Sequence, residues 1–138
     1  MVYHGGQFMD LKKIADGMTA MTCIVSVEKH PKKGRGKFRI VTGNEAYIAS
    51  IEHPAPGTEM LTDKFTPNTE YTNYLTRDMN FEDYCYRAAI DKKCLHSYAH
   101  PDRMDVWLNM MFIPLEVDDD DLGYCTTASV MSSSSTSV

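Results

Sequence analysis

The sequence predicts an α+β domain: a five-stranded antiparallel sheet, helices packed on one face, and an additional N-terminal helix. Two strand-like segments follow an amphipathic segment, helix-forming segments fill the middle of the chain, and three strand-like segments come last. Strands that follow one another after a helical insert are typical of an antiparallel sheet with segregated helices. With 138 residues, 43% of them hydrophobic, the chain is long enough for one domain with its own core.

The N-terminal unit, residues 1–20, contains an amphipathic helix. Phe8, Leu11, Ile14 and Met18 recur at three- and four-residue spacing, which predicts a helix over residues 7–19. This apolar stripe can cover the sheet of its own chain or pair with the same stripe of a second copy.

Two strands are expected next, over residues 21–29 and 37–42. The first is apolar on both alternating sides, which predicts burial on both faces of the sheet. The basic segment between them, residues 30–37, contains Pro and Gly and is interpreted as a solvated turn.

The middle of the chain carries three helix-start signals. Asn44 is a good N-cap, and the helix that it opens ends at the Pro-rich segment 53–57. Thr66 followed by Pro67 predicts a second short helix. Asn80 opens a third, with Lys92 and Lys93 expected in its last turn. The stripe of the third helix is Phe81, Tyr84, Cys85, Ala88 and Ala89.

Three strands are expected over residues 95–100, 104–117 and 122–130. In the long strand, Val106, Leu108, Met110 and Phe112 alternate with Trp107, Asn109, Met111 and Ile113, so the two sets face opposite sides of the sheet. Alternation alone does not identify which set faces inward. The main domain therefore covers residues 21–130, and the Ser-rich segment 131–138 is interpreted as a disordered tail.

Charge and cysteine content exclude some functions. The net charge is −5 and residues 118–121 are all Asp, so no nucleic-acid partner is expected. No apolar run approaches the ~20 residues of a membrane span, so no membrane contact is expected. The four cysteines form no CxxC pair and no secretory signal is visible, which predicts reduced thiols and a cytoplasmic location.

Two segments resemble the PAS family of sensor domains over about residues 15–130. Residues 38–47, FRIVTGNEAY, are similar to a PAS strand that enters a helix through an N-x-A step. Residues 105–114, DVWLNMMFIP, followed by an acidic turn and Leu122-Gly123-Tyr124, resemble the PAS C-terminal hairpin. Pro101-Asp102-Arg103 stands where the family usually has an Asp-Gly turn. Residues 80–124 also resemble N-terminal sensor regions of bacterial diguanylate-cyclase-type signalling proteins.

The resemblance implies a signal-transduction sensor that is not an enzyme in its own right. Such domains bind a small molecule or a protein partner between sheet and helices, form homodimers, and regulate an output domain or a partner. The second resemblance makes cyclic-dinucleotide synthesis one candidate output. No particular cofactor is indicated: the helix that carries a flavin-binding cysteine is absent, and His53 is the one candidate haem ligand.

Six residues are the expected ligand-binding set, because together they combine apolar walls with a few polar tips. They are Tyr47, Ile51, Tyr74, Tyr84, Trp107 and Asn109. Core packing is the alternative role for each aromatic member.

A small α+β enzyme with a Cys/His site is the alternative function. It requires Cys94 or Cys85 within hydrogen-bond reach of His96, His100 or His53. Cys94, His96, Tyr98 and His100 share one face of a strand, but a closed metal site needs four converging ligands, so neither a catalytic nor a metal site is assigned.

Overall fold

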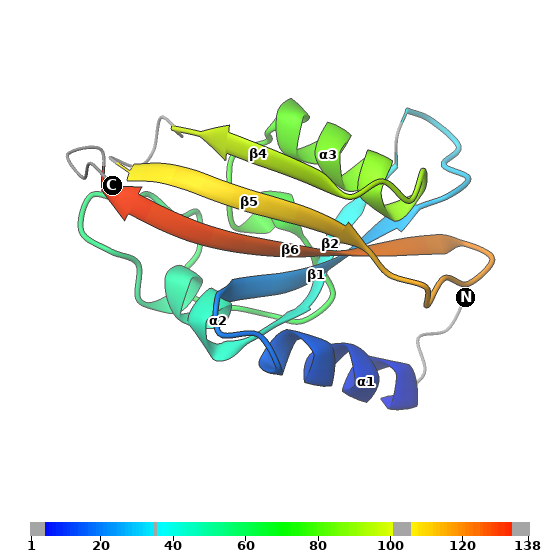
Figure 1. Ribbon diagram of the computed structural model, residues 1–138, viewed down its shortest axis with the longest axis horizontal. Helices are drawn as coiled ribbons and strands as arrows, with labels where there is room; N and C mark the ends of the chain where they lie inside the picture. Colours follow the sequence, from blue (N-terminus) through cyan, green and yellow to red (C-terminus); the bar gives the residue numbers. More distant parts are fainter. Residues whose placement is uncertain (1–4, 35, 101–105, 134–138) are drawn as a thin grey trace.

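The computed structural model describes residues 5–34, 36–100 and 106–133, and it confirms the α+β class (Figure 1). Its sheet is antiparallel with the strand order β3-β2-β1-β6-β5-β4, so the expectation of five strands was one strand too few. The elements are α1 (Gly5–Asp16), β1 (Met21–Glu28), β2 (Phe38–Gly43), α2 (Glu45–Glu52), β3 (Thr69–Glu70), the 3-10 turn η1 (Tyr71–Asn73), α3 (Met79–Ala89), β4 (Leu95–Ala99), β5 (Val106–Pro114) and β6 (Leu122–Ser133).

Strands β1 and β6 form the centre of the sheet. They pair along their whole shared length, from Met21 opposite Ser129 to Glu28 opposite Leu122. Residues 22–27 of β1 are all buried, as its apolar character on both sides predicted. Cys23, Val25 and Val27 face one side of the sheet and Ile24 faces the other. Both faces of β1 are therefore covered.

Helices α2 and α3 cover one face of the sheet and enclose the larger part of the core. Figure 1 shows α3 and α1 on opposite sides of the strands. Cys85, Ala88 and Ala89 of α3 are fully buried, and they pack in one cluster with Phe112 of β5 and Cys125 of β6. The small alanine side chains let the helix approach the strands closely.

Helix α1 packs on the opposite face, against strands of its own chain. Leu11 and Ala15 are fully buried beside Ile24 and Tyr124. The expected stripe was therefore partly wrong: Ile14 is 37% exposed, and Ala15 lies in the contact instead. The predicted stripe included Ile14 instead of its neighbour Ala15. The small side chain of Ala15 adds little to the apolar pattern from which the buried side was predicted.

Asn44 joins the end of β2 to α2, as its position predicted. Its side-chain oxygen accepts from the backbone N–H of Tyr47, which caps the helix, and from that of Thr22 at 3.1 Å. Its amide nitrogen donates to the carbonyls of Met18 and Ala20. One side chain thus connects α2, β1 and the loop that follows α1.

The segment after Pro67 does not form the expected helix. Asn68 adopts a positive φ of 57°, and Thr69 and Glu70 then pair with Ile40 and Arg39 as strand β3. Pairing with β2 satisfies backbone groups that a helix would have had to satisfy internally. Only the short turn η1 follows.

Helix α3 begins and ends earlier than predicted. Asp78 is its N-cap and accepts from the N–H groups of Asn80 and Phe81. The helix ends at Ala89, so Lys92 and Lys93 lie beyond its last turn. Lys92 has a φ of 57° and binds the Asp118 carboxylate at 2.6 Å instead.

The C-terminal strands confirm the predicted alternation. Leu108 and Phe112 are buried on the α3 side of β5, whereas Trp107 and Asn109 are on the other side. Strand β6 continues to Ser133, three residues into the segment interpreted as a tail, because Met131–Ser133 pair with β5. Residues 101–105, which include the whole expected proline turn, and residues 134–138 lie outside the described residues. In the described part of the chain, none of the helices has the length and apolar character needed to cross a membrane.

Candidate ligand-binding cleft

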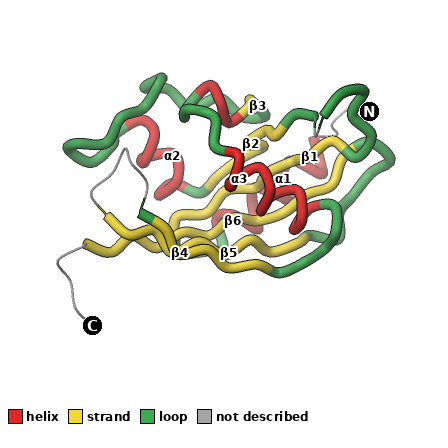
Figure 2. The backbone as a smooth tube through the Cα atoms, turned by 90° about the horizontal axis from the view of Figure 1, so that it is seen from above, coloured by secondary structure: helices red, strands yellow, loops and turns green. Residues whose placement is uncertain are grey.

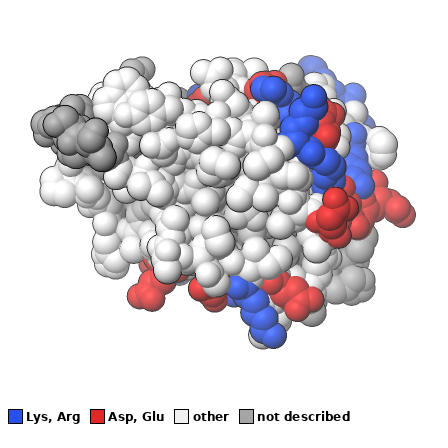
Figure 3. Space-filling view, in the orientation of Figure 1, with Lys and Arg blue, Asp and Glu red and all other residues white. Residues whose placement is uncertain are grey.

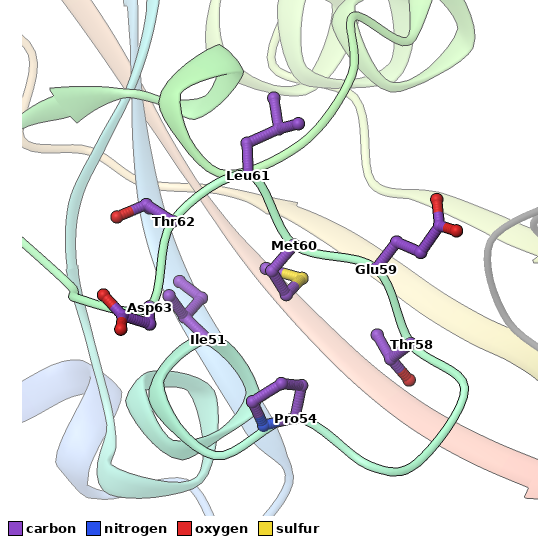
Figure 4. A pocket seen from close by; sticks show the side chains of 8 residues that line it. All are labelled: Ile51, Pro54, Thr58, Glu59, Met60, Leu61, Thr62 and Asp63. Atoms are coloured by element: carbon purple, nitrogen blue, oxygen red, sulfur yellow. The ribbon is translucent and has the colours of Figure 1, made fainter.

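A cleft lies between the end of α2 and the extended segment 58–63. Its volume is about 750 Å³, within the range of small-molecule sites, and it is open to solvent. Figure 4 shows the residues that line it: Ile51, Pro54, Thr58, Glu59, Met60, Leu61, Thr62 and Asp63.

The floor of the cleft is apolar and belongs to the core. Ile51 is 1% exposed and packs in the same cluster as half-buried Met60. In Figure 4 the side chain of Met60 points toward Ile51 and Pro54, whereas Leu61 points the opposite way. Leu61 is 63% exposed, so its side chain faces solvent rather than the floor of the cleft (Figure 4).

The segment that forms the outer wall is attached to the fold at Leu61 and again at Phe65, just after it. The N–H of Leu61 donates to the carbonyl of Tyr74 at 2.9 Å. The N–H of Phe65 donates to the Glu52 carboxylate at 3.0 Å. Before these contacts, Gly57 at φ 85° reverses the chain. Figure 2 shows this long loop running from α2 around one end of the sheet.

An aromatic layer lies behind the floor. The rings of Phe65 and Tyr74 stack with centroids 5.7 Å apart, and Tyr47 meets Phe65 edge-on at 6.2 Å. The Tyr74 hydroxyl donates to the Thr66 carbonyl at 2.7 Å and accepts from the Thr66 N–H. The layer is therefore a rigid support that holds the loop against the core.

The polar groups of the cleft determine which ligands suit it. Thr58 and Thr62 supply hydroxyls, and Glu59 and Asp63 supply carboxylates. None of the eight lining residues is Lys or Arg. A cationic or uncharged ligand therefore finds hydrogen-bond partners here, whereas an anionic ligand meets only like charge.

The six residues of the expected ligand-binding set do not meet at one site. Ile51 lines the cleft, and Tyr47 and Tyr74 form the aromatic layer behind it. Tyr84 lies apart on α3, where its ring stacks on Phe112 at 5.0 Å.

Trp107 and Asn109 lie on the opposite face of the sheet. Asn109 pairs with Tyr98 in the strand register, and the Trp107 and Tyr98 rings stack there at 5.0 Å. These two residues cannot line a pocket with Tyr47 or Ile51.

The segment 58–63 was missed as a site because it has no helical or strand periodicity. Its length carried the only signal: sixteen residues, 53–68, separate α2 from β3. Loops that long are uncommon in compact domains and often bind ligands.

The cysteines differ sharply in environment. Burial raises the pKa of the Cys23 thiol to about 12, despite its hydrogen bond with Thr127, and raises the pKa of Cys85 well above its ordinary value. Both therefore remain protonated at neutral pH and are poor nucleophiles. Cys94 is the exposed cysteine.

The histidines expected beside Cys94 make contacts across the sheet. The Nε2 of His96 lies 2.6 Å from the Asn109 side-chain oxygen, and the His100 ring meets Trp107 edge-on. Within the described ranges, no three His, Cys, Asp or Glu residues are grouped so that they could hold a metal ion.

A smaller polar cavity of about 200 Å³ lies near the start of α3. It is lined in part by Glu82, a buried residue that is 5% exposed. The Glu82 carboxylate accepts from the Tyr71 hydroxyl at 2.5 Å and from Arg77 at 3.1 Å. The contacts join η1 to α3, so these groups are engaged in holding the fold.

Comparison with known proteins gave no match to a family model, to a curated protein or to a solved structure.

Proposed function

We propose that this chain is a PAS-like sensor domain that binds a small, partly apolar, uncharged or cationic molecule in the cleft beside α2. Binding would regulate an output domain, such as one for cyclic-dinucleotide synthesis, or a protein partner in the cytoplasm. The observation that carries the proposal is the cleft itself: an apolar floor at Ile51 and Met60 beneath an acidic rim.

The order of elements supports the family part of the proposal. Two strands precede a helical insert and three strands follow it, which is the arrangement that the resemblance implies; the two-residue edge strand β3 within the insert is additional to it. Helices α2 and α3 lie on one face, so a ligand in the cleft contacts both the helical layer and the loop before β3.

The construction of the cleft supports a sensor role. Its outer wall is a loop fastened at Leu61 and Phe65, while the preceding chain from Ala55 to Thr58 is held by one hydrogen bond within the loop itself. A ligand that bridges the floor and this loop would order the loop and alter the surface that it presents. Such ordering transmits binding without any chemical step.

Three probes of one size and different charge test the ligand chemistry. Benzylamine, benzyl alcohol and benzoate share a ring and differ in the polar group. In a titration followed by amide NMR shifts, we expect benzylamine to bind at least as tightly as benzyl alcohol, with shifts centred on residues 51–63. We expect benzoate to be the weakest, because Glu59 and Asp63 repel it.

Paired variants provide the control. Glu59→Gln together with Asp63→Asn should abolish the preference for the amine and leave benzyl alcohol binding unchanged. Glu45→Gln removes a carboxylate from the first turn of α2, outside the residues that line the cleft. It should change neither the preference for the amine nor the binding of benzyl alcohol. Shifts that never concentrate in residues 51–63, or tighter binding of benzoate, would refute the proposed site.

A further inference from the structure

The 3-10 turn η1 lies between the outer wall of the cleft and the start of α3, and it is hydrogen-bonded to both. The turn covers Tyr71–Asn73, and Tyr74 follows it directly. The N–H of Tyr74 donates to the Tyr71 carbonyl at 3.0 Å, so the two tyrosines are held at opposite ends of one turn. A displacement of either tyrosine therefore reaches the other.

Tyr74 is the residue to which the cleft wall is attached. Its carbonyl accepts from the Leu61 N–H at 2.9 Å, and its hydroxyl forms two hydrogen bonds with the backbone of Thr66. It is 1% exposed and its ring stacks on Phe65, so it has little freedom to absorb a movement of the wall. A ligand that fixes the wall near Leu61 therefore also fixes Tyr74.

Tyr71 is the residue that holds the start of α3. Its hydroxyl accepts from the backbone N–H of Asp78 at 2.9 Å and donates to the Glu82 carboxylate at 2.5 Å. Burial, and next the hydrogen bond to Glu82, raise the pKa of Tyr71, so the hydroxyl keeps the proton that it donates. Asp78 is the N-cap whose carboxylate accepts from the N–H groups of Asn80 and Phe81. The first turn of α3 therefore depends on the position of Tyr71.

The contact between Tyr71 and α3 can open without leaving a buried charge unpaired. Glu82 is 5% exposed, and removing the partner of a buried carboxylate is strongly unfavourable. Arg77 is a second partner, because its Nε donates to the same carboxylate at 3.1 Å. The hydrogen-bond geometry of a 3-10 turn is also poorer than that of an α-helix. The contact is thus able to exist in a closed and an open state.

We propose that η1 transmits occupancy of the cleft to the start of α3. A ligand that fixes the wall at Leu61 keeps Tyr74 and η1 in place, which holds the Tyr71 contact closed and orders the first turn of the helix. Two events that order the same segment favour each other. The inference rests on the proposed function, because it requires a ligand in the cleft, and it names the element that carries the signal. Met79 in that turn is 62% exposed, so the change is accessible to an output domain or a partner.

The other face of the sheet provides an internal reference. Tyr71 and Tyr74 pack in the cluster on the α3 side, whereas Trp107 and Tyr98 stack on the opposite face at 5.0 Å. Figure 3 shows a broad area without acidic or basic side chains in the middle of the view, where β4, β5 and β6 lie in Figure 1. A ligand effect that travels through η1 therefore leaves β4 and β5 unchanged.

Amide hydrogen exchange, measured by NMR with and without saturating benzylamine, tests this coupling. Exchange in the native state reports how often a segment opens locally. In wild-type protein, benzylamine should slow exchange about fivefold or more at four amides beyond the cleft, because couplings between sites are commonly of that size. These amides belong to Asp78, Asn80, Phe81 and Glu82, and those of β4 and β5 should not change.

The outcomes separate the coupling from the ligand site. Chemical-shift changes at residues 51–63 with unchanged exchange at the start of α3 would overturn the coupling and leave the ligand site standing. Absence of shift changes at residues 51–63 would refute the ligand site, and the coupling would fall with it.

Tyr71→Phe tests the contact itself, because it keeps the ring in the core and removes the hydroxyl that bonds to Asp78 and Glu82. Benzylamine should still shift residues 51–63, but its protection of the first turn of α3 should be lost. Tyr84→Phe is the matched control, which removes a hydroxyl farther along the same helix and should keep the protection.

Each variant is compared with itself, with and without benzylamine, so a general loss of stability does not enter the comparison. Protection of α3 that persists in Tyr71→Phe would overturn the proposal. The wild-type comparison alone decides it if that variant does not fold.

Discussion

Asn44 shows how one side chain can organise three elements. It makes four hydrogen bonds to backbone groups of the loop after α1, of β1 and of α2, and it is 5% exposed. A helix cap alone contributes about 1 kcal/mol, and each buried backbone group left without a partner costs about 1–3 kcal/mol.

Asn44→Ala is therefore expected to lower the free energy of unfolding by about 2–4 kcal/mol, measured by urea denaturation. Asn80→Ala, at a position in the first turn of α3 where the cap is Asp78, is the control and should change stability by less than about 0.5 kcal/mol. Equal losses for the two variants would show that Asn44 is an ordinary polar residue.

The buried thiol of Cys23 leads us to expect that the free energy of unfolding falls at alkaline pH. Burial, the largest cause, raises its folded-state pKa from 9.0 to about 12. Between these values the unfolded chain releases the thiol proton and the folded chain keeps it, so the unfolded state binds fewer protons. Stability is then fully present below pH 9 and falls as pH rises, by roughly 1 kcal/mol per pH unit for this group.

The measurement compares urea unfolding of wild type and Cys23→Ala from neutral pH to pH 11. The variant should lose stability less steeply above pH 9, although its stability at neutral pH is lower because it lacks the packed sulfur. Cys94→Ala, which changes the exposed thiol, should keep the wild-type slope. An identical slope in all three proteins would contradict the burial of Cys23.

At the scale of elements, the sequence predicted what local chemistry determines. The Asn44 cap, the strand at 21–28 and the two faces of β5 follow from side-chain periodicity and capping, and the structure has all of them. The helix predicted after Thr66-Pro67 is wrong because this segment pairs with β2 over only two residues, which is too short to produce a recognisable alternation in the sequence. Helix α3 ends before Lys92, which has a positive φ and forms an ion pair with Asp118. Asp118 is distant in sequence, so a local pattern could not indicate this pairing.

The contact of α3 with β6 depends on Gly123. A β-carbon at this position would lie 2.6 Å from the Ala89 carbonyl oxygen and 2.8 Å from Ile90. Because one of these neighbours is backbone, the helix itself must move to make room.

Gly123→Ala is expected to destabilise the fold by about 1–3 kcal/mol, as overpacking does in other cores. Hydrogen exchange should accelerate first at the amides of α3, since that helix is displaced. Unchanged stability together with unchanged α3 exchange would contradict the close packing of this helix on β6.

At the scale of the whole molecule, the sheet separates two surfaces. One surface carries α2, α3 and the cleft, whose floor is Ile51 and Met60. The other surface carries α1. The sequence predicted an α+β domain with alternating strand faces, but it could not place Trp107 relative to Tyr47. That relation depends on which face α3 packs against, which is set by contacts between distant segments.

Hydrogen exchange with and without benzylamine tests the central claim most directly, because it reports where a ligand orders the chain. The account predicts slower exchange in residues 51–65, with the strands β4 and β5 unchanged. Protection confined to β4 and β5, or no protection at a benzylamine concentration that saturates the NMR shifts, would contradict a sensor cleft beside α2.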